Sequence, residues 1–138
     1  MHEWSIVYGI LSSIKENYGD SVTYLKISIG ELVQIDLEVF KFALEEVSKL
    51  LGFKNDIKYD IEIEETKFRC TACGYVWSWR DVERQIESSI QDRELAKTFL
   101  EAIHLVPSTV YAYVRCPKCG SPDFEIIEGA DIKVLEVR

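Results

Sequence analysis

With 138 residues, the chain is long enough for one modest hydrophobic core and a second, smaller domain. A domain of that size needs a cross-link such as a bound metal ion or a disulfide to be stable. The formal net charge of −8 and the absence of any run of Lys or Arg argue against a nucleic-acid partner, which requires a basic face. No apolar stretch approaches the roughly 20 residues of a membrane span. The first residues also lack the basic segment and small-residue cleavage site of a secretion signal. We therefore expect a cytoplasmic protein that does not act in a membrane.

The first elements are predicted from hydrophobic periodicity. Residues 4–18 predict an amphipathic helix, because apolar side chains recur every three or four positions and polar ones fill the other face. Residues 22–29 predict a strand, since Leu25, Ile27 and Ile29 alternate with more polar residues. A helix and the first strand of a sheet are thus expected within the first thirty residues.

A second helix and a second strand follow. Asp36 is a suitable N-cap for a helix that continues to Leu51. Residues 57–68 predict one strand with one buried face and one solvent-exposed face. Its apolar positions are Ile57, Tyr59, Ile61 and Ile63.

Four cysteines form two identical motifs, Cys70-x-x-Cys73 and Cys116-x-x-Cys119. Each motif places two thiolates on one tight turn, and two such turns make a tetrahedral zinc site. The glycine that follows each motif suits the backbone of a knuckle turn. A redox CxxC usually stands alone at the start of a helix, so the pair favours structural zinc over a disulfide or redox function.

The segment between the two motifs, residues 74–115, is longer than a compact zinc ribbon needs. Residues 80–105 predict helix, with a break near Gln91–Asp92 where Asp92 can cap a second helix. Val110–Val114 predicts a strand that leads to the second motif. Trp77 and Trp79, beside the first motif, are expected in the core of the ribbon.

Two short strands, 124–127 and 132–137, are predicted to return the chain to its first domain. The order of elements predicts an α+β fold: a small sheet with two helices on one face, plus an inserted zinc-ribbon domain with four cysteine ligands. We expect the first domain over 1–67 and 127–138, and the zinc-binding domain over 68–126 with the helical insert at 80–105.

The N-terminal sequence Met1-His2-Glu3 offers a second metal site. A free amine of Met1, the backbone amide of His2 and the imidazole of His2 can form two adjoining chelate rings. These nitrogens favour a planar or tetragonal ion such as Ni(II) or Cu(II). The alternative is an ordinary helix N-terminus, with Glu3 at the positive end of the helix dipole.

The chain resembles the hydrogenase maturation nickel metallochaperones of the HypA/HybF family over nearly its whole length. The resemblance rests on Met1-His2-Glu3, residues 29–32 (Ile-Gly-Glu-Leu), Phe40 and Phe42, and the two cysteine motifs with their flanking residues. It implies a protein that carries Ni(II) without turnover for [NiFe]-hydrogenase and holds structural Zn(II) through the four cysteines. Nickel would be bound through Met1 and His2, and Glu3 would assist delivery and partner contact.

The resemblance also implies a HypB-type GTPase and the hydrogenase large subunit as partners, and it leaves homo-oligomers open. The long insert resembles archaeal members, in which a histidine of this segment can close over the terminal nickel. His104 matches that position, although a histidine at a helix C-terminus is also favoured by the helix dipole. The alternative function is a zinc-ribbon adaptor that binds a protein or, less readily given the charge, a nucleic acid.

Overall fold

In the computed structural model, which describes residues 2–138, the chain divides into two compact units. The first unit contains residues up to Ser28, Gln34–Glu62 and Lys133–Arg138. The second contains Ile29–Val33 and Ile63–Ile132. None of the helices found from residue 2 onward has the length and hydropathy required to span a membrane.

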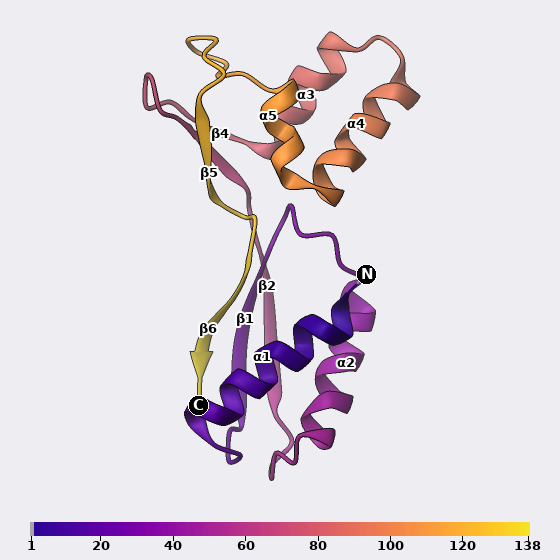
Figure 1. Cartoon of the computed structure of the whole chain (residues 1–138), viewed down its shortest axis with the longest axis vertical. Helices are drawn as coiled ribbons and strands as arrows, with labels where there is room; N and C mark the ends of the chain where they lie inside the picture. The colour runs from indigo at the N-terminus through magenta and orange to yellow at the C-terminus, as the bar shows by residue number, and fades with distance from the viewer. Residues whose placement is uncertain (1) are drawn as a thin grey trace. The chain divides into compact units, whose positions relative to one another are not determined.

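The first unit is built on a three-stranded sheet with the strand order β2-β1-β6. Its strands are β1 (Tyr24–Gly30), β2 (Lys58–Glu64) and β6 (Ile132–Val137). Helices α1 (Glu3–Tyr18) and α2 (Leu37–Leu50) pack on each other over one face of this sheet (Figure 1). The predicted sheet with two helices on one face is therefore confirmed.

Alternation explains which face the helices cover. Leu25, Ile27 and Ile29 are buried, whereas Tyr24 and Lys26 on the opposite face stay partly exposed. The helices contribute one buried stripe each, formed by Val7, Leu11 and Ile14 of α1 and by Phe40, Leu44 and Val47 of α2.

The second unit combines a small antiparallel sheet with the helical insert (Figure 1). The sheet has the order β4-β3-β5. Its strands are β3 (Lys67–Cys70), β4 (Val76–Ser78) and β5 (Phe124–Glu128). The insert consists of α3 (Trp79–Ser89), α4 (Arg93–Leu105), a 3₁₀ turn (Pro107–Thr109) and α5 (Val110–Tyr113).

The predicted break in the insert is confirmed, and its cause is the Asp92 cap. The Asp92 carboxylate accepts hydrogen bonds from the amides of Glu94 and Leu95, at 2.9 and 3.2 Å. The predicted strand over Val110–Val114 is wrong. This segment forms α5, because the Val114 amide closes a helical turn onto the Val110 carbonyl at 3.0 Å. The turn places Val110 in the core without any partner strand.

The single strand predicted over residues 57–68 is also wrong, because the chain leaves the first sheet after Glu64 and begins β3 at Lys67. The expected buried face is only half-buried, and Ile63 is 57% exposed. The break falls at Thr66, whose amide donates to the Glu31 carboxylate at 3.0 Å rather than to a neighbouring strand. A period-two pattern does not reveal such a side-chain contact.

Three segments meet in a hydrogen-bonded junction formed by Gly30, Glu31, Glu64, Thr66 and Gly129. The Gly129 amide donates to the Glu64 carboxylate at 2.7 Å, and the Thr66 hydroxyl donates to the Gly129 carbonyl at 3.3 Å. A Cβ on Gly30 would lie 2.4 Å from the Gly129 backbone. Gly129 has φ of 83°, and a Cβ there would lie 2.4 Å from the Thr66 Cα. Both positions therefore require glycine, because the backbone of another segment lies where a Cβ would be.

Replacement of Gly129 by alanine should lower the free energy of unfolding of the second unit by at least about 2 kcal/mol. The new Cβ meets backbone and sits at a φ that L-residues avoid. Denaturant unfolding followed by circular dichroism measures the change. Gly9→Ala is the matched control, because nothing lies within 4 Å of its Cβ and alanine favours the helix by about 1 kcal/mol. Equal stability of the Gly129→Ala variant and the parent would contradict the junction's role.

Candidate metal sites

The first cysteine knuckle is a tight turn at the end of β3. The amides of Cys73 and Gly74 point back to Cys70, one to its sulfur at 3.4 Å and one to its carbonyl at 2.9 Å. Gly74 supplies the positive φ of 78° that closes the turn. The Cys70 amide is bonded to the Tyr75 carbonyl at 2.9 Å, so the backbone holds the turn before any metal binds.

The second knuckle repeats this geometry. The Cys119 amide donates to the Cys116 sulfur at 3.5 Å, and the Gly120 amide donates to the Cys116 carbonyl at 2.9 Å. Gly120 has φ of 73°, and the Cys116 amide bonds the Ser121 carbonyl at 3.0 Å. Two equivalent knuckles face each other, as the spacing of the motifs predicts.

The four sulfur atoms converge on one point. All lie within 4.8 Å of one another, with Cys70 to Cys119 at 3.5 Å and Cys73 to Cys116 at 3.7 Å. Tetrahedral zinc with Zn–S bonds of about 2.3 Å requires sulfurs roughly 3.8 Å apart. Burial raises the pKa of the Cys70 thiol, but hydrogen bonds from the amides of Cys73 and Ala72 and from the Cys119 and Cys73 thiols together outweigh it and lower the pKa to about 7. The cluster therefore fits a structural zinc ion.

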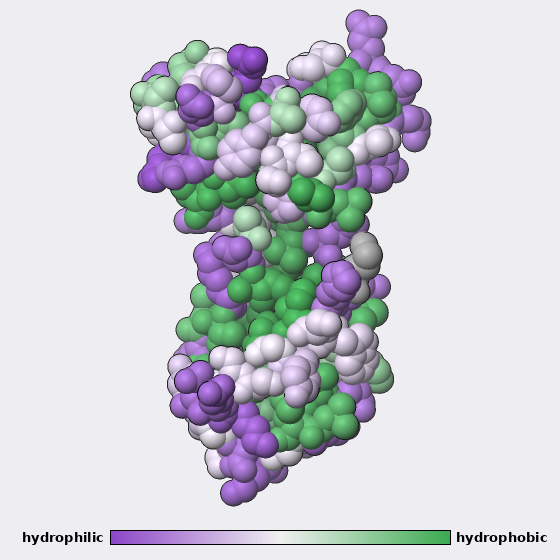
Figure 2. All heavy atoms as spheres, viewed as in Figure 1, coloured by the Kyte–Doolittle hydropathy of each residue, from purple (hydrophilic) through white to green (hydrophobic). Residues whose placement is uncertain are grey.

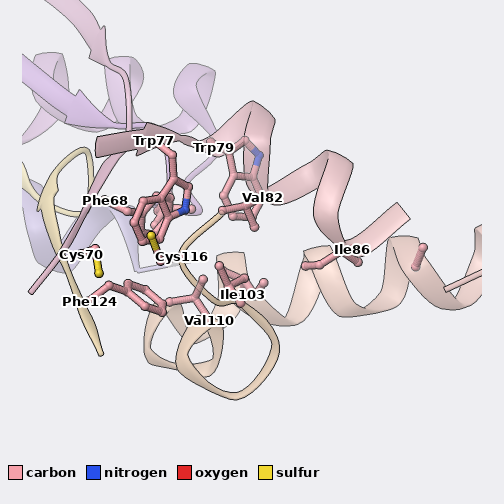
Figure 3. Packing of buried hydrophobic residues seen from close by; sticks show 13 residues of the cluster. Phe68, Cys70, Trp77, Trp79, Val82, Ile86, Ile103, Val110, Cys116 and Phe124 are labelled. Atoms are coloured by element: carbon pink, nitrogen blue, oxygen red, sulfur yellow. The ribbon is translucent and has the colours of Figure 1, made fainter. Parts of the chain in front are cut away.

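An aromatic core supports the knuckles (Figure 3). Phe68, opposite Trp77 across β3 and β4, stacks on that indole with ring centroids 5.7 Å apart. Phe124 of β5 meets both rings edge-on. Trp77 and Trp79 are buried, which confirms the expected ribbon core. The same cluster includes Cys70 and Cys116 as well as residues of the insert, so metal site and insert share one core.

The N-terminal candidates lie in the first unit. Met1 is outside the described residues. His2 is exposed and immediately precedes α1. Glu3 is buried, and its carboxylate accepts a hydrogen bond from the Asp36 amide at 2.8 Å. That hydrogen bond is the largest of several effects that together lower the pKa of Glu3 to about 2. The first turn of α1 is thus tied to the cap of α2.

His104 lies in the second unit, one residue before the end of α4. Its side chain is half-buried and meets the Trp79 ring edge-on, with centroids 4.9 Å apart. The roles of Asp36 as a partner of Glu3 and of Trp79 as a partner of His104 were missed by sequence reasoning. Both pairs are distant in sequence, and no periodicity signals them.

The fold and the closed thiolate cluster define a small zinc-binding protein of two units. The whole chain, residues 1–138, matches the family model described as "Hydrogenase/urease nickel incorporation, metallochaperone, hypA". The chain therefore belongs to the HypA family, whose members are nickel metallochaperones for hydrogenase maturation and not enzymes.

Relatives and solved structures agree with this family. The chain is 33% identical to the hydrogenase maturation factor HypA of Pyrococcus furiosus, over 97% of this chain and 92% of that protein. It is 30% identical to the factor of Thermococcus sibiricus, over 100% of this chain and 96% of that protein. The solution structure of the Ni metallochaperone HypA from Helicobacter pylori has the same fold, with a TM-score of 0.58 and 21% identity over 99% of this chain and 96% of that one.

Replacement of Cys73 by serine should release zinc and disorder the aromatic core of the second unit, because three thiolates no longer close the site. Metal analysis and near-ultraviolet circular dichroism measure the two effects. Ala72→Ser is the matched control, since this exposed knuckle residue supplies no ligand. A Cys73→Ser variant with full zinc content and an unchanged aromatic spectrum would contradict the assignment of all four cysteines as zinc ligands.

The Glu3 carboxylate should titrate near pH 2. Because its pKa is depressed on folding, its ionised form contributes stability above the ordinary value near 4.5, and this contribution is lost as pH falls toward 2. Carbon-13 NMR of the carboxyl group measures the midpoint directly. Glu3→Gln removes the signal and should flatten the pH dependence of the first unit between about 4.5 and 2. A midpoint at or above 4 would contradict a Glu3 carboxylate held by the Asp36 amide at the start of α1.

Proposed function

We propose that this chain carries Ni(II) at its N-terminus, bound by the Met1 amine and the amide and imidazole nitrogens of His2. The observation that carries the proposal is the placement of His2: it is exposed, and it directly precedes a helix whose first residue is fixed. Three nitrogens of adjoining chelate rings suit a planar d⁸ ion such as Ni(II). The four cysteine sulfurs are clustered with one another in the second unit, so they serve the zinc site and not the nickel site in this proposal.

Glu3 acts in this proposal as the anchor of the nickel-binding terminus. Its carboxylate is held by the Asp36 amide at 2.8 Å, and the Asp36 carboxylate in turn caps α2 through the amides of Glu38 and Val39. The chelating residues are thereby attached to a rigid helix pair. Release follows when the short terminal segment exchanges its nitrogens for those of an acceptor, or when protons compete for the imidazole and the amine.

His104, which matches the insert histidine of archaeal members, is proposed as a further nickel ligand. It is half-exposed, and no hydrogen bond or ion pair to another described residue occupies its imidazole. An imidazole suits nickel as a donor. His104→Ala should weaken nickel binding and change the visible spectrum, whereas a histidine that only complements the helix dipole would leave both unchanged.

The proteins that would receive the nickel are those implied by membership of the HypA family. We propose that the protein works in the cytoplasm with a HypB-type GTPase and with the large subunit of a [NiFe]-hydrogenase. Exposed apolar residues are available to such partners on the first unit (Figure 2). Trp4 is 43% exposed and packs edge-on against Phe42, which is 55% exposed, beside the nickel-binding terminus.

The proposed nickel site requires a native amino terminus. Acetylation of the Met1 amine should abolish tight nickel binding, because it removes that nitrogen as a donor, and His2→Ala should do the same. Calorimetry and the visible absorption of planar Ni(II) measure the loss, with zinc content as the control for folding. Unchanged nickel uptake in either variant would contradict the proposal and favour a zinc-ribbon adaptor.

A further inference from the structure

The residue that precedes each cysteine motif is held in a different way. Arg69, before Cys70, lies in β3, the central strand of the β4-β3-β5 sheet, and it is paired with one residue in each neighbouring strand. Arg115, before Cys116, lies in no strand, because α5 ends at Tyr113 and β5 begins only after the second motif. The chain that enters the second knuckle therefore has no strand neighbour.

A glutamine side chain from α3 takes the place of that neighbour. The Gln85 carboxamide accepts a hydrogen bond from the Arg115 amide at 2.9 Å and donates one to the Arg115 carbonyl at 3.1 Å. Both backbone groups of one residue are thus bound together, as they are in a hydrogen-bonded pair of an antiparallel sheet. Only one orientation of the carboxamide satisfies both bonds, because its oxygen only accepts and its nitrogen only donates. The pairing therefore fixes the Arg115 backbone relative to α3.

Both ends of this pairing are anchored in the core of the second unit. Gln85 is half-buried and is followed by the buried Ile86, and Arg115 lies between the buried Val114 and Cys116. Ile86, Val114 and Cys116 belong to the same hydrophobic cluster. Apolar packing is not directional, so it places these side chains without fixing the orientation of the peptide groups between them. The two hydrogen bonds of Gln85 supply that direction.

We propose that Gln85 is a positioning residue for the zinc site, which sets the approach of the second knuckle to the metal. Its carboxamide holds the residue directly before Cys116, whose sulfur is one of the four that lie within 4.8 Å of one another. A ligand that is held in place before the metal arrives loses less conformational freedom on binding. This role is independent of the proposed nickel site, because it involves only residues of the second unit.

The test measures zinc affinity and the rate of zinc release in the full chain, with a chromophoric chelator as competitor. Gln85→Glu keeps the size of the side chain but replaces the donor nitrogen by a carboxylate oxygen, which the Arg115 carbonyl repels. Gln85→Met removes both hydrogen bonds without adding charge, and both new residues favour a helix as glutamine does. Each variant should bind zinc about tenfold less tightly and release it faster, as expected for the loss of one or two hydrogen bonds.

Two control variants separate this contact from the effects of charge and of helix stability. Gln91→Glu makes the same change of charge in the insert, at an exposed side chain with no hydrogen bond to any residue from 2 to 138, and should leave zinc binding unchanged. Ser78→Ala removes the capping box at the start of α3 and leaves the Gln85 pairing in place. It should lower the thermal stability yet keep the zinc affinity close to that of the parent.

Cobalt supplies a readout of ligand geometry. Co(II) bound in place of zinc reports the arrangement of the four thiolates through its visible absorption. In both Gln85 variants the absorption bands should shift or weaken, because the second knuckle no longer meets the metal in the same way, whereas Ser78→Ala should give the parent spectrum. Zinc affinity and cobalt spectra that are unchanged in both Gln85 variants overturn the proposal. An equal loss of zinc affinity in Ser78→Ala also overturns it, because the stability of α3 would then account for the effect.

Discussion

The closure of four thiolates on one metal ion is the constraint on which the second unit depends. The two knuckles are separated by residues 74–115, and the small β4-β3-β5 sheet alone offers little core to hold them together. The backbone bonds of each knuckle preset the cysteines, and the metal then joins the two turns. Because Cys70 and Cys116 belong to the same buried cluster as Val82 and Ile103, this closure also fixes the helical insert.

The chemistry of the donors keeps structural metal and cargo apart. The four clustered sulfur atoms would hold zinc in a closed site with no open position, which suits permanent retention. In the proposed nickel site, the terminus supplies nitrogen donors, which suit Ni(II) and can be given up when the segment moves or is protonated. A carrier needs both properties, because a cargo site as closed as the thiolate cluster would not release its ion.

Local signals in the sequence were sufficient wherever a short range of residues decides the structure. The motif spacing predicted the zinc cluster, and Asp36 and Asp92 cap their helices as expected. The errors lie where tertiary contacts override local preference. Val110–Val114 has the β-branched and aromatic content of a strand but completes a helical turn, and Thr66 ends a strand by binding Glu31. Long-range pairs such as Trp79 with His104 have no sequence signal.

The most direct test of the account is X-ray absorption at the nickel and zinc edges of one untagged sample loaded with both metals. The account predicts nitrogen and oxygen ligands around nickel with no sulfur, and four sulfur ligands around zinc. Sulfur scattering at the nickel edge would place the cargo at the cysteines and contradict the division between a terminal nickel site and a thiolate zinc site.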